Sequence, residues 1–251
     1  FNSKLLACES VAILPQDMSR ERFDWLKSIA GQIIATPGCE SNVKEIFDKT
    51  WELKKDPTMM IFNQFAEMGN PLWHYNVTGY ALADLFEAIK KPGQNFAGAC
   101  FTSGSAGTMS AGDLLKERYP HLKLAVGEAL QCPTILDNGF GGHRIEGIGD
   151  DFIPAVVDRS LIDQVADIND LDAIAMAAKL GRVLGLGVGI SSGANFLGAV
   201  LQNREPGRQV ATVFADDSKK YLTTLLATPP AETTDMVTAR IELLGYEPVE
   251  V

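Results

Sequence analysis

The chain has 251 residues, a length that fits one large or two small domains, and its 46% apolar and 22% charged residues are typical of a soluble globular protein. Its 22 basic and 32 acidic side chains give a net charge of −10, which argues against nucleic acid or an acidic membrane surface as a partner. No apolar run reaches membrane-spanning length, and the first residues, FNSKLLACES, have no signal-peptide layout.

The cysteines and histidines offer little for metal binding. The four cysteines form no Cys-x-x-Cys pair, and none of His74, His121 and His143 lies at helical ligand spacing from another. We therefore expect neither a zinc site nor a disulfide framework, and we predict a reduced, cytoplasmic setting.

Short apolar runs alternate with amphipathic stretches along the whole chain, a pattern typical of parallel strands joined by helices. In the first half, this pattern predicts strands at residues 10–14, 33–35 and 59–62. Helices are predicted after the capping residues Ser19 and Ser41, and a third through residues 82–89. Residues 63–79 are predicted to form a polar loop after the third strand.

The second half continues in the same way. Strands are predicted at residues 96–101, 122–126, 188–190 and 210–215, with an irregular span at 131–154. Helices are predicted through Leu114 and Leu115, after Asn169 or Asp170, and after the loop at 189–195. The chain shows no internal repeat or clear linker, and the alternation of elements indicates an α/β fold.

The small residues between the strand at 96–101 and the next helix are the most informative local feature. In Thr102-Ser103-Gly104-Ser105-Ala106-Gly107-Thr108, successive backbone N–H groups can converge at a helix N-terminus and bind a phosphate dianion. The segment is neither a Walker motif nor a dinucleotide-binding fingerprint. A tight strand-to-helix turn that needs small residues explains it equally well.

Three more segments could carry chemistry. Residues 189–195 follow a predicted strand at its carboxyl end, where ligands bind to open parallel sheets. Ser191 in residues 189–195 could contact a ring heteroatom or simply cap a helix. The glycines of 147–154 permit close approach to a ligand or serve turn geometry. His74 in residues 63–79 is better explained as a hydrogen-bonded loop histidine than as a catalytic group.

Taken in order, these segments resemble the cysteine synthase/cystathionine β-synthase family of pyridoxal-phosphate enzymes, whose fold is shared with tryptophan synthase β subunits and threonine dehydratases. The resemblance implies the fold-type II architecture: open, mostly parallel twisted sheets with helices on both faces, in two domains. We expect residues 1–60 to belong to the smaller mobile domain and residues 61–251 to form the larger cofactor-binding domain. The matching segments are PQDMSRERFDWLKSIAGQIIATPG, NQF with the following NP, H and VTG, TSGSAGT, GIGDDFIPAVVDRSLIDQV, GISSGAN and DDSKKYLTT.

The resemblance also implies roles for single residues. Gly104, Ser105, Ala106, Gly107 and Thr108 stand where the family's Gly-Thr-Gly-Gly-Thr loop holds the phosphate of pyridoxal 5'-phosphate. Ser105 and Ala106 depart from that pattern, which backbone N–H donors tolerate.

Outside that loop, Ser191 matches the serine whose hydroxyl meets the pyridine nitrogen. Gln64 matches the position associated with the substrate carboxylate, and Gly147 and Gly149 match the loop that closes over the open face of the cofactor.

The family's cofactor-bearing lysine has no counterpart here. Its Ser-x-Lys-Asp-Arg-like segment and its Ser-Gly-Asn substrate loop would both lie upstream of Phe1, and no lysine of the chain stands in a matching context. We therefore assign no catalytic residue and expect the chain to be a fragment, incomplete at its N-terminus.

The activity implied for the parent protein is β-elimination or β-replacement on a small amino acid, through an aminoacrylate, with a thiol as one possible nucleophile. A serine/threonine dehydratase or a cysteine desulfhydrase-type lyase is the alternative among enzymes. A non-catalytic relative that has lost the lysine is the alternative outside them. The resemblance further implies a homodimer.

Overall fold

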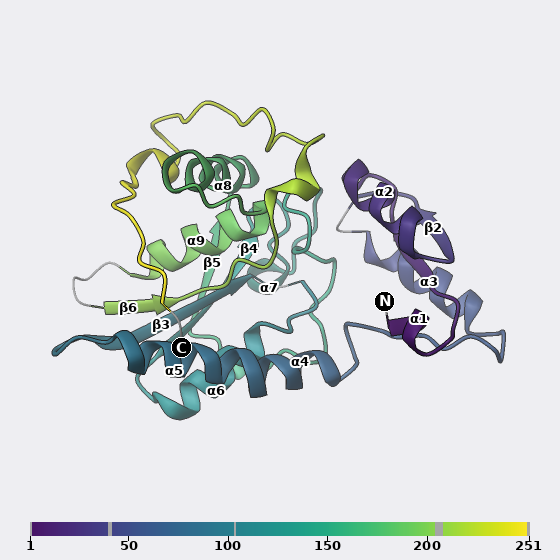
Figure 1. The fold of residues 1–251 in the computed structure, drawn as a ribbon, viewed down its shortest axis with the longest axis horizontal. Helices are drawn as coiled ribbons and strands as arrows, with labels where there is room; N and C mark the ends of the chain where they lie inside the picture. The colour runs from purple at the N-terminus through teal and green to yellow at the C-terminus, as the bar shows by residue number, and fades with distance from the viewer. Residues whose placement is uncertain (1, 40–41, 103, 204–207, 250–251) are drawn as a thin grey trace.

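The computed structural model describes residues 2–39, 42–102, 104–203 and 208–249. Along the chain, helices and strands alternate as the hydrophobic pattern predicts (Figure 1). The elements are α1 (Asn2–Leu5), β1 (Val11–Pro15), α2 (Arg20–Ile29), β2 (Gln32–Thr36), α3 (Val43–Leu53), α4 (Gly69–Trp73), the π-helix η1 (His74–Gly79), α5 (Tyr80–Ile89), β3 (Asn95–Thr102), α6 (Met109–Arg118), β4 (Lys123–Ala129), α7 (Thr134–Asp137), η2 (Arg159–Leu161), β5 (Gln164–Ile168), α8 (Asp170–Leu184), α9 (Ile190–Gln202), β6 (Arg208–Ala211), η3 (Ser218–Tyr221) and η4 (Thr238–Arg240).

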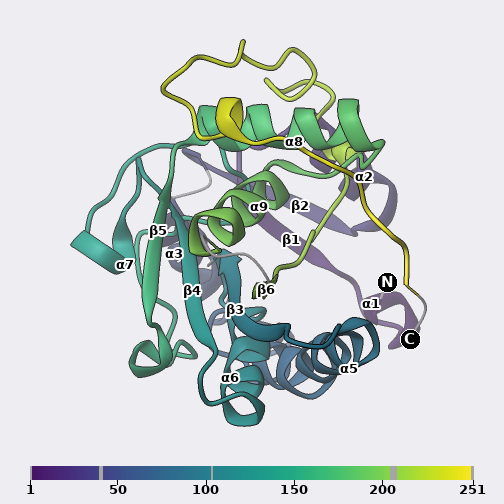
Figure 2. The same cartoon turned by 90° about the vertical axis from the view of Figure 1, so that its left-hand side faces the viewer.

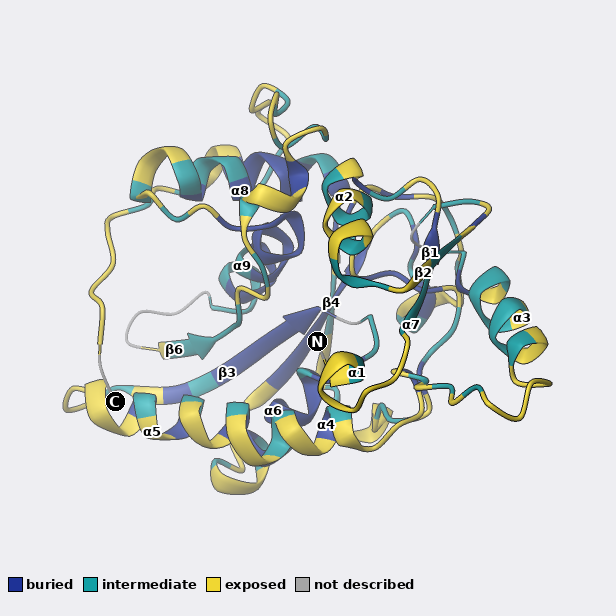
Figure 3. Cartoon of the chain, turned by 45° about the vertical axis from the view of Figure 1, so that its right-hand side comes forward, coloured by how far each residue is buried: buried dark blue, intermediate teal, exposed yellow. Residues whose placement is uncertain are grey.

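The larger sheet has the strand order β5-β4-β3-β6, and every pairing in it is parallel within the described residues. Figure 2 shows α8 and α9 on one side of this sheet and α5 and α6 on the other. Helices on both faces bury the sheet, which is why β3 and β4 are largely dark blue in Figure 3. This arrangement confirms the predicted α/β class.

The apolar residues of the sheet form a core layer on each face. One layer lies between the sheet and α8 and α9, and it includes Ile174, Leu180 and Leu197. The other lies between the sheet and α5 and α6, where the ring centroids of Phe86 and Phe96 are 4.6 Å apart. These two layers fix the central strand β3, and therefore the loop that follows it, in a rigid frame.

The first part of the chain forms a smaller unit. Strands β1 and β2 pair in parallel, with a register that runs from Val11 opposite Gln32 to Pro15 opposite Thr36. Helices α2 and α3 pack against these two strands. Helix α2 buries none of its residues, and α3 buries only Val43. Because so little of its surface is covered, this unit depends on a few contacts with the rest of the chain to hold its position.

Several local predictions need correction. No strand forms at residues 59–62, where Met60 and Phe62 are each 77% exposed, because no described strand edge lies alongside to pair with this segment. The strand predicted at 188–190 is a single bridge between Val188 and Asp217. The strand predicted at 210–215 already ends at Ala211.

One strand was missed, and one predicted loop is partly helical. Strand β5 was missed, because this short edge strand, QVADI, is neither a continuous apolar run nor a regular alternation of polar and apolar residues. The polar loop predicted at 63–79 becomes helical from Gly69 onward, since Pro71 lies in the first turn of α4, where its missing N–H costs no hydrogen bond. Asn42 occupies the N-cap position of α3, and the predicted cap Ser41 lies outside the described residues.

Candidate functional site

The loop between β3 and α6 presents backbone donors at a helix N-terminus. Within the described residues, the N–H groups of residues 105–108 have no hydrogen-bond partner, whereas the carbonyls of Ala106, Gly107 and Thr108 accept from the first residues of α6. Helix α6 has ten residues, so its dipole adds positive potential at the same place. Converging amides at such a helix start form a donor set suited to a phosphate dianion.

Gly104 lies in close contact with the second glycine segment. A Cβ atom at Gly104 would stand 2.2 Å from the carbonyl oxygen of Gly147, so only glycine fits there. The structure thus brings together two loops that are far apart in the sequence. The next residues show a further constraint, because Ala106 adopts a left-handed conformation with φ of 63° and is 2% exposed.

On its other side, the loop contacts the segment that contains Gln64. Asn70 Nδ2 donates to Ser105 Oγ at 3.1 Å and to the carbonyl of Gln64 at 3.4 Å. A Cβ atom at Gly107 would lie 2.1 Å from Asn70 Oδ1, which shows how closely α4 packs on the loop. The side chain of Gln64 itself is exposed. Asn70 therefore joins two of the predicted site segments.

His74 lies in the π-helical turn η1 and also packs against Gly107. Its Nδ1 is 2.9 Å from Thr78 Oγ1, and burial lowers the pKa of the ring. The predicted role as a hydrogen-bonded histidine fits these contacts. The π-helix, a rare conformation that is frequent at functional sites, was not predicted.

Ser191 lies in the first turn of α9, after the N-cap residue Gly189, and is 7% exposed. Four residues on, Asn195 accepts a 2.7 Å hydrogen bond from the N–H of Thr102 and donates one of 2.9 Å to the carbonyl of Val213. Asn195 therefore fixes the helix that carries Ser191 to the end of β3. The sequence analysis gave Asn195 no role, although a buried amide that follows a small-residue turn is a signal for one.

Gly147 and Gly149 both have positive φ angles, 101° and 76°, which favour glycine. The buried side chain of His143 forms hydrogen bonds with this segment. Its Nδ1 accepts from the N–H of Ile145 at 3.1 Å, so Nε2 carries the proton and donates to the carbonyl of Gly149 at 3.2 Å. Burial lowers the pKa of His143 and favours this neutral form.

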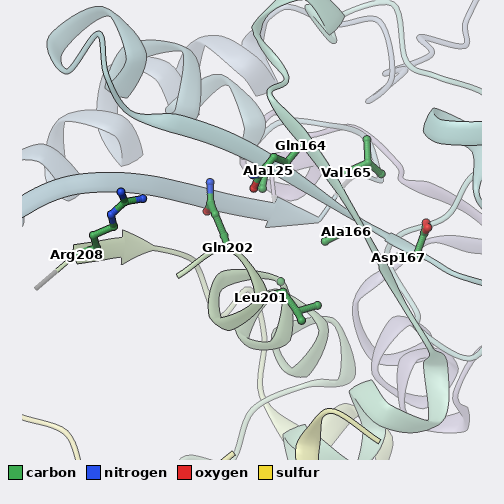
Figure 4. Close-up of a pocket in the computed structure, with 9 residues that line it drawn as sticks. Ala125, Gln164, Val165, Ala166, Asp167, Leu201, Gln202 and Arg208 are labelled. Atoms are coloured by element: carbon green, nitrogen blue, oxygen red, sulfur yellow. The ribbon is translucent and has the colours of Figure 1, made fainter. Parts of the chain in front are cut away.

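One cavity lies away from these residues. It has a volume of about 650 Å³ and opens beside the amino-terminal ends of β5 and β6 and the end of α9 (Figure 4). Its lining residues include none of the predicted site residues, which gather at the carboxyl ends of the strands. Within the described part of the chain, no cluster of His, Cys, Asp and Glu is arranged to hold a metal ion, and no helix is long and apolar enough to cross a membrane.

Comparison with known proteins assigns this arrangement to a family. Residues 3–216 match the family model described as "Pyridoxal-phosphate dependent enzyme". The cysteine synthase of Staphylococcus aureus is 30% identical over 221 residues, which cover 87% of this chain and 69% of that protein. Cysteine synthase B of Campylobacter jejuni is 32% identical over 223 residues, which cover 87% of this chain and 72% of that protein.

The fold agrees with solved structures of the same group. A hydrogen sulfide-producing enzyme of Fusobacterium nucleatum superposes with a TM-score of 0.85 and 34% identity, over 95% of this chain and 72% of that one. The chain is thus a pyridoxal-phosphate-dependent enzyme of fold-type II. Within that class it belongs to the cysteine synthase/cystathionine β-synthase family, which carries out β-replacement and β-elimination on small amino acids. The comparisons do not favour a dehydratase or desulfhydrase, or a non-catalytic relative.

The hydrogen-bond donors of this site fit the cofactor of this family. The unpartnered amides of residues 105–108 suit its phosphate monoester, and Gly104 has no room for a side chain beside it. Ser191 is 7% exposed, and its hydroxyl is a neutral hydrogen-bonding group of the kind that suits a pyridine nitrogen.

Proposed function

We propose that residues Gly104–Thr108 bind the phosphate of pyridoxal 5'-phosphate. The cofactor then serves β-replacement or β-elimination on a small amino acid, and a thiol is the nucleophile in the replacement. The observation that carries the proposal is the row of unpartnered amides at the start of α6. When bound, the cofactor withdraws electrons from the substrate carbon that loses its proton.

The protein residues bind and orient the reacting groups. Ser191 Oγ shares a hydrogen bond with the pyridine nitrogen, and because a hydroxyl is neutral, it leaves the ring less electron-withdrawing than a carboxylate partner would. Gln64 binds the substrate carboxylate, because its exposed side chain can be reached by a substrate. The segment with Gly147 and Gly149 covers the open face and excludes water.

We also propose that the chain contributes to two domains. Residues 1–60 belong to the smaller, mobile domain and residues 61–251 to the larger, cofactor-binding domain. The separate β1–β2 sheet and the sparse burial of α2 and α3 support this boundary. We propose that the protein acts as a homodimer, as the family resemblance implies, and in the cytoplasm, as the lack of a disulfide pattern among its four cysteines favours.

The binding proposal is tested by comparing pyridoxal 5'-phosphate with pyridoxal, which lacks only the phosphate, in equilibrium dialysis with this chain. We expect the phosphate to improve affinity by at least about tenfold, because charge-assisted hydrogen bonds to several amides contribute about 1.5–3 kcal/mol each. Equal affinities for the two compounds would refute the assignment of the loop.

The reaction is tested with the intact, cofactor-loaded protein. Adding O-acetylserine or serine should change the visible absorbance of the cofactor, and a thiol should then restore it if replacement follows. Release of a keto acid without thiol consumption would indicate elimination instead. An absorbance unchanged by both amino acids would contradict β-chemistry. The matched variant Ser191→Ala should retain the phosphate-dependent affinity but alter the absorbance spectrum, since it removes only the partner of the ring nitrogen.

A further inference from the structure

The segment Glu146–Phe152, which contains both site glycines, contacts the small N-terminal unit at each of its two ends. At the first end, Arg22 Nε of α2 donates to Glu146 Oε2 at 2.6 Å, and the N–H of Ser19 donates to Glu146 Oε1 at 3.1 Å. Both charged side chains are largely shielded, with exposed fractions of 23% for Arg22 and 12% for Glu146. A shielded ion pair of this kind holds its geometry better than a solvated one.

Arg22 also reaches the far C-terminal part of the fold. Its second guanidinium nitrogen donates to the hydroxyl of Tyr221 at 2.9 Å, and that hydroxyl donates to Asp216 Oδ2 at 2.7 Å. Tyr221 is only 1% exposed. Figure 1 shows α2 beside this region, in which η3 lies. One guanidinium therefore joins the small unit, the glycine segment and the larger unit.

The other end of the segment is held by an aromatic cluster. The ring of Phe152 lies 5.6 Å from that of Phe47 on α3 and 5.1 Å from that of Phe65, which follows Gln64. Phe47 and Phe65 are themselves 5.8 Å apart, so the three rings form a closed triangle. Edge-to-face rings at such distances attract each other beyond their burial alone.

Between these ends, the segment is attached to the larger unit. Cys132 Sγ donates to the carbonyl of Gly149 at 3.3 Å, and Thr134 Oγ1 donates to the carbonyl of Asp150 at 2.8 Å. Gly147, next to Glu146, meets Gly104 of the proposed phosphate loop. A displacement of α2 or α3 would therefore reach the segment at Glu146 and Phe152, on either side of Gly147, while the hydrogen bonds of Gly149 and Asp150 join it to the larger unit.

We infer that Arg22 and Phe47 are positioning residues that couple the placement of the small N-terminal unit to the glycine segment 146–152 and, through Gly147, to the loop at Gly104. When the unit shifts, the segment moves against the phosphate loop, and the two glycine positive-φ positions supply the pivots. The consequence for cofactor binding rests on the proposed function, whereas the mechanical coupling does not.

The test uses hydrogen exchange of this chain without cofactor, measured by mass spectrometry on the peptide that spans residues 145–152. Arg22→Met and Phe47→Leu should each speed exchange there by about tenfold or more, as loss of a local anchor allows local opening. Arg20→Met and Trp51→Leu are the matched controls, because they change exposed residues of the same two helices. We expect both controls to leave this peptide unchanged.

A second readout separates positioning from general stability. Arg22→Lys, which keeps one donor for Glu146, should restore most of the protection that Arg22→Met loses. The preference for pyridoxal 5'-phosphate over pyridoxal should fall in Arg22→Met and recover in Arg22→Lys. If Arg22→Met unfolds the whole chain, then Phe47→Leu decides, and unchanged local exchange in that variant would overturn the inference.

The two proposals fail in different ways. Unchanged exchange at 145–152 in Arg22→Met and Phe47→Leu overturns the coupling, whatever the cofactor does. Equal affinity of the unmodified chain for pyridoxal 5'-phosphate and pyridoxal overturns the proposed phosphate loop, while the exchange result stands on its own.

Discussion

The backbone N–H of Thr102 and the side chain of Asn195 are joined by a 2.7 Å hydrogen bond that is buried between β3 and α9. Thr102 is the last residue of the central strand, and the proposed phosphate loop starts directly after it. Asn195 thus sets the place at which that loop leaves the sheet. The loop and the helix with Ser191 are therefore both anchored by this hydrogen bond.

Asn195→Ala should destabilise the fold strongly. The substitution leaves the N–H of Thr102 and the carbonyl of Val213 without their partner, and each buried polar group without a partner costs about 1–3 kcal/mol. We expect the free energy of unfolding in urea to fall by roughly 2–4 kcal/mol. Asn76→Ala, which removes an exposed hydrogen bond to the carbonyl of Leu72, is the control and should change it by less than about 1 kcal/mol. Equal effects would contradict the anchoring role.

Gly104→Ala should damage cofactor binding. The added methyl group would stand 2.2 Å from the backbone oxygen of Gly147, so one of the two loops must move. We expect affinity for pyridoxal 5'-phosphate to fall by about tenfold or more, because displaced amides bind the phosphate less well. A tenfold loss corresponds to about 1.4 kcal/mol of binding free energy. Gly69→Ala, at a glycine with open space around it, should leave the affinity unchanged in the same dialysis measurement. Unaltered binding in Gly104→Ala would show that the contact is not needed.

Substitutions at Ala106 test the backbone conformation of the loop. Its φ of 63° is strained for alanine, so Ala106→Gly relieves strain in the folded state but adds freedom to the unfolded one. We expect the two effects to offset, with unfolding free energy within about 1 kcal/mol of the original and cofactor binding retained. Ala106→Val should lose more than about 2 kcal/mol, because a β-branched side chain is a poor fit both to this φ and to the packed surroundings.

The valine substitution needs a matched control. Ala35→Val, at an exposed position of β2, should be tolerated, because β-branched residues favour strands. Thermal or urea unfolding of the three variants would check this order. A stable Ala106→Val variant with intact binding would disprove the left-handed conformation at this residue.

His143 should make the fold sensitive to mild acid. Burial lowers the pKa of His143 below its ordinary value of 6.5, so the unfolded chain binds this proton more readily than the folded chain does. The contribution to stability is therefore intact above pH 6.5 and is lost as the pH falls below that value, at up to about 1.4 kcal/mol per pH unit. Urea unfolding at several pH values between neutral and mildly acidic conditions measures this slope.

The variant for this test is His143→Asn, whose side-chain oxygen can still accept from the N–H of Ile145. It should be less stable near neutral pH but should lose less stability on acidification. His121→Gln, at an exposed position, should keep the original pH dependence. A slope that survives in His143→Asn would assign the acid sensitivity to another group.

Hydrophobic periodicity was sufficient to predict the α/β class and most elements of the larger sheet's core, although not strand β5. Strand β3 and helix α5 are clear examples, because their apolar residues face a continuous core. The failures lie where a segment's neighbours decide its structure. Residues 59–62 are apolar enough for a strand but have no described strand beside them, and Val188 forms only one bridge.

The site was partly visible in the sequence. Small residues between a strand and a helix predicted the loop at Gly104–Thr108. The residues alone left Ser191 as either a contact to a ring heteroatom or a helix cap, and the family resemblance supplied its role and that of Gln64. Asn70, Asn195 and His143, which connect these segments, were not singled out as connectors. Their importance arises from contacts between residues far apart in the sequence, such as the 93 positions between Thr102 and Asn195, and no local pattern reveals those.

The π-helical turn at His74–Gly79 has a consequence for how this region tolerates change in length. Such a turn holds one residue more than an α-helix needs, so deleting Val77 would let α4 and α5 merge into one regular helix. Because the wide turn absorbs the extra residue, the helices on either side keep nearly the rotation of one continuous α-helix, and the deletion would leave Asn70 facing Ser105. A one-residue deletion within the regular helix α5 would instead rotate its two parts by about 100° against each other, because an α-helix turns once every 3.6 residues. The π-helical turn is therefore a place where the chain can lose a residue without turning Asn70 away from the loop.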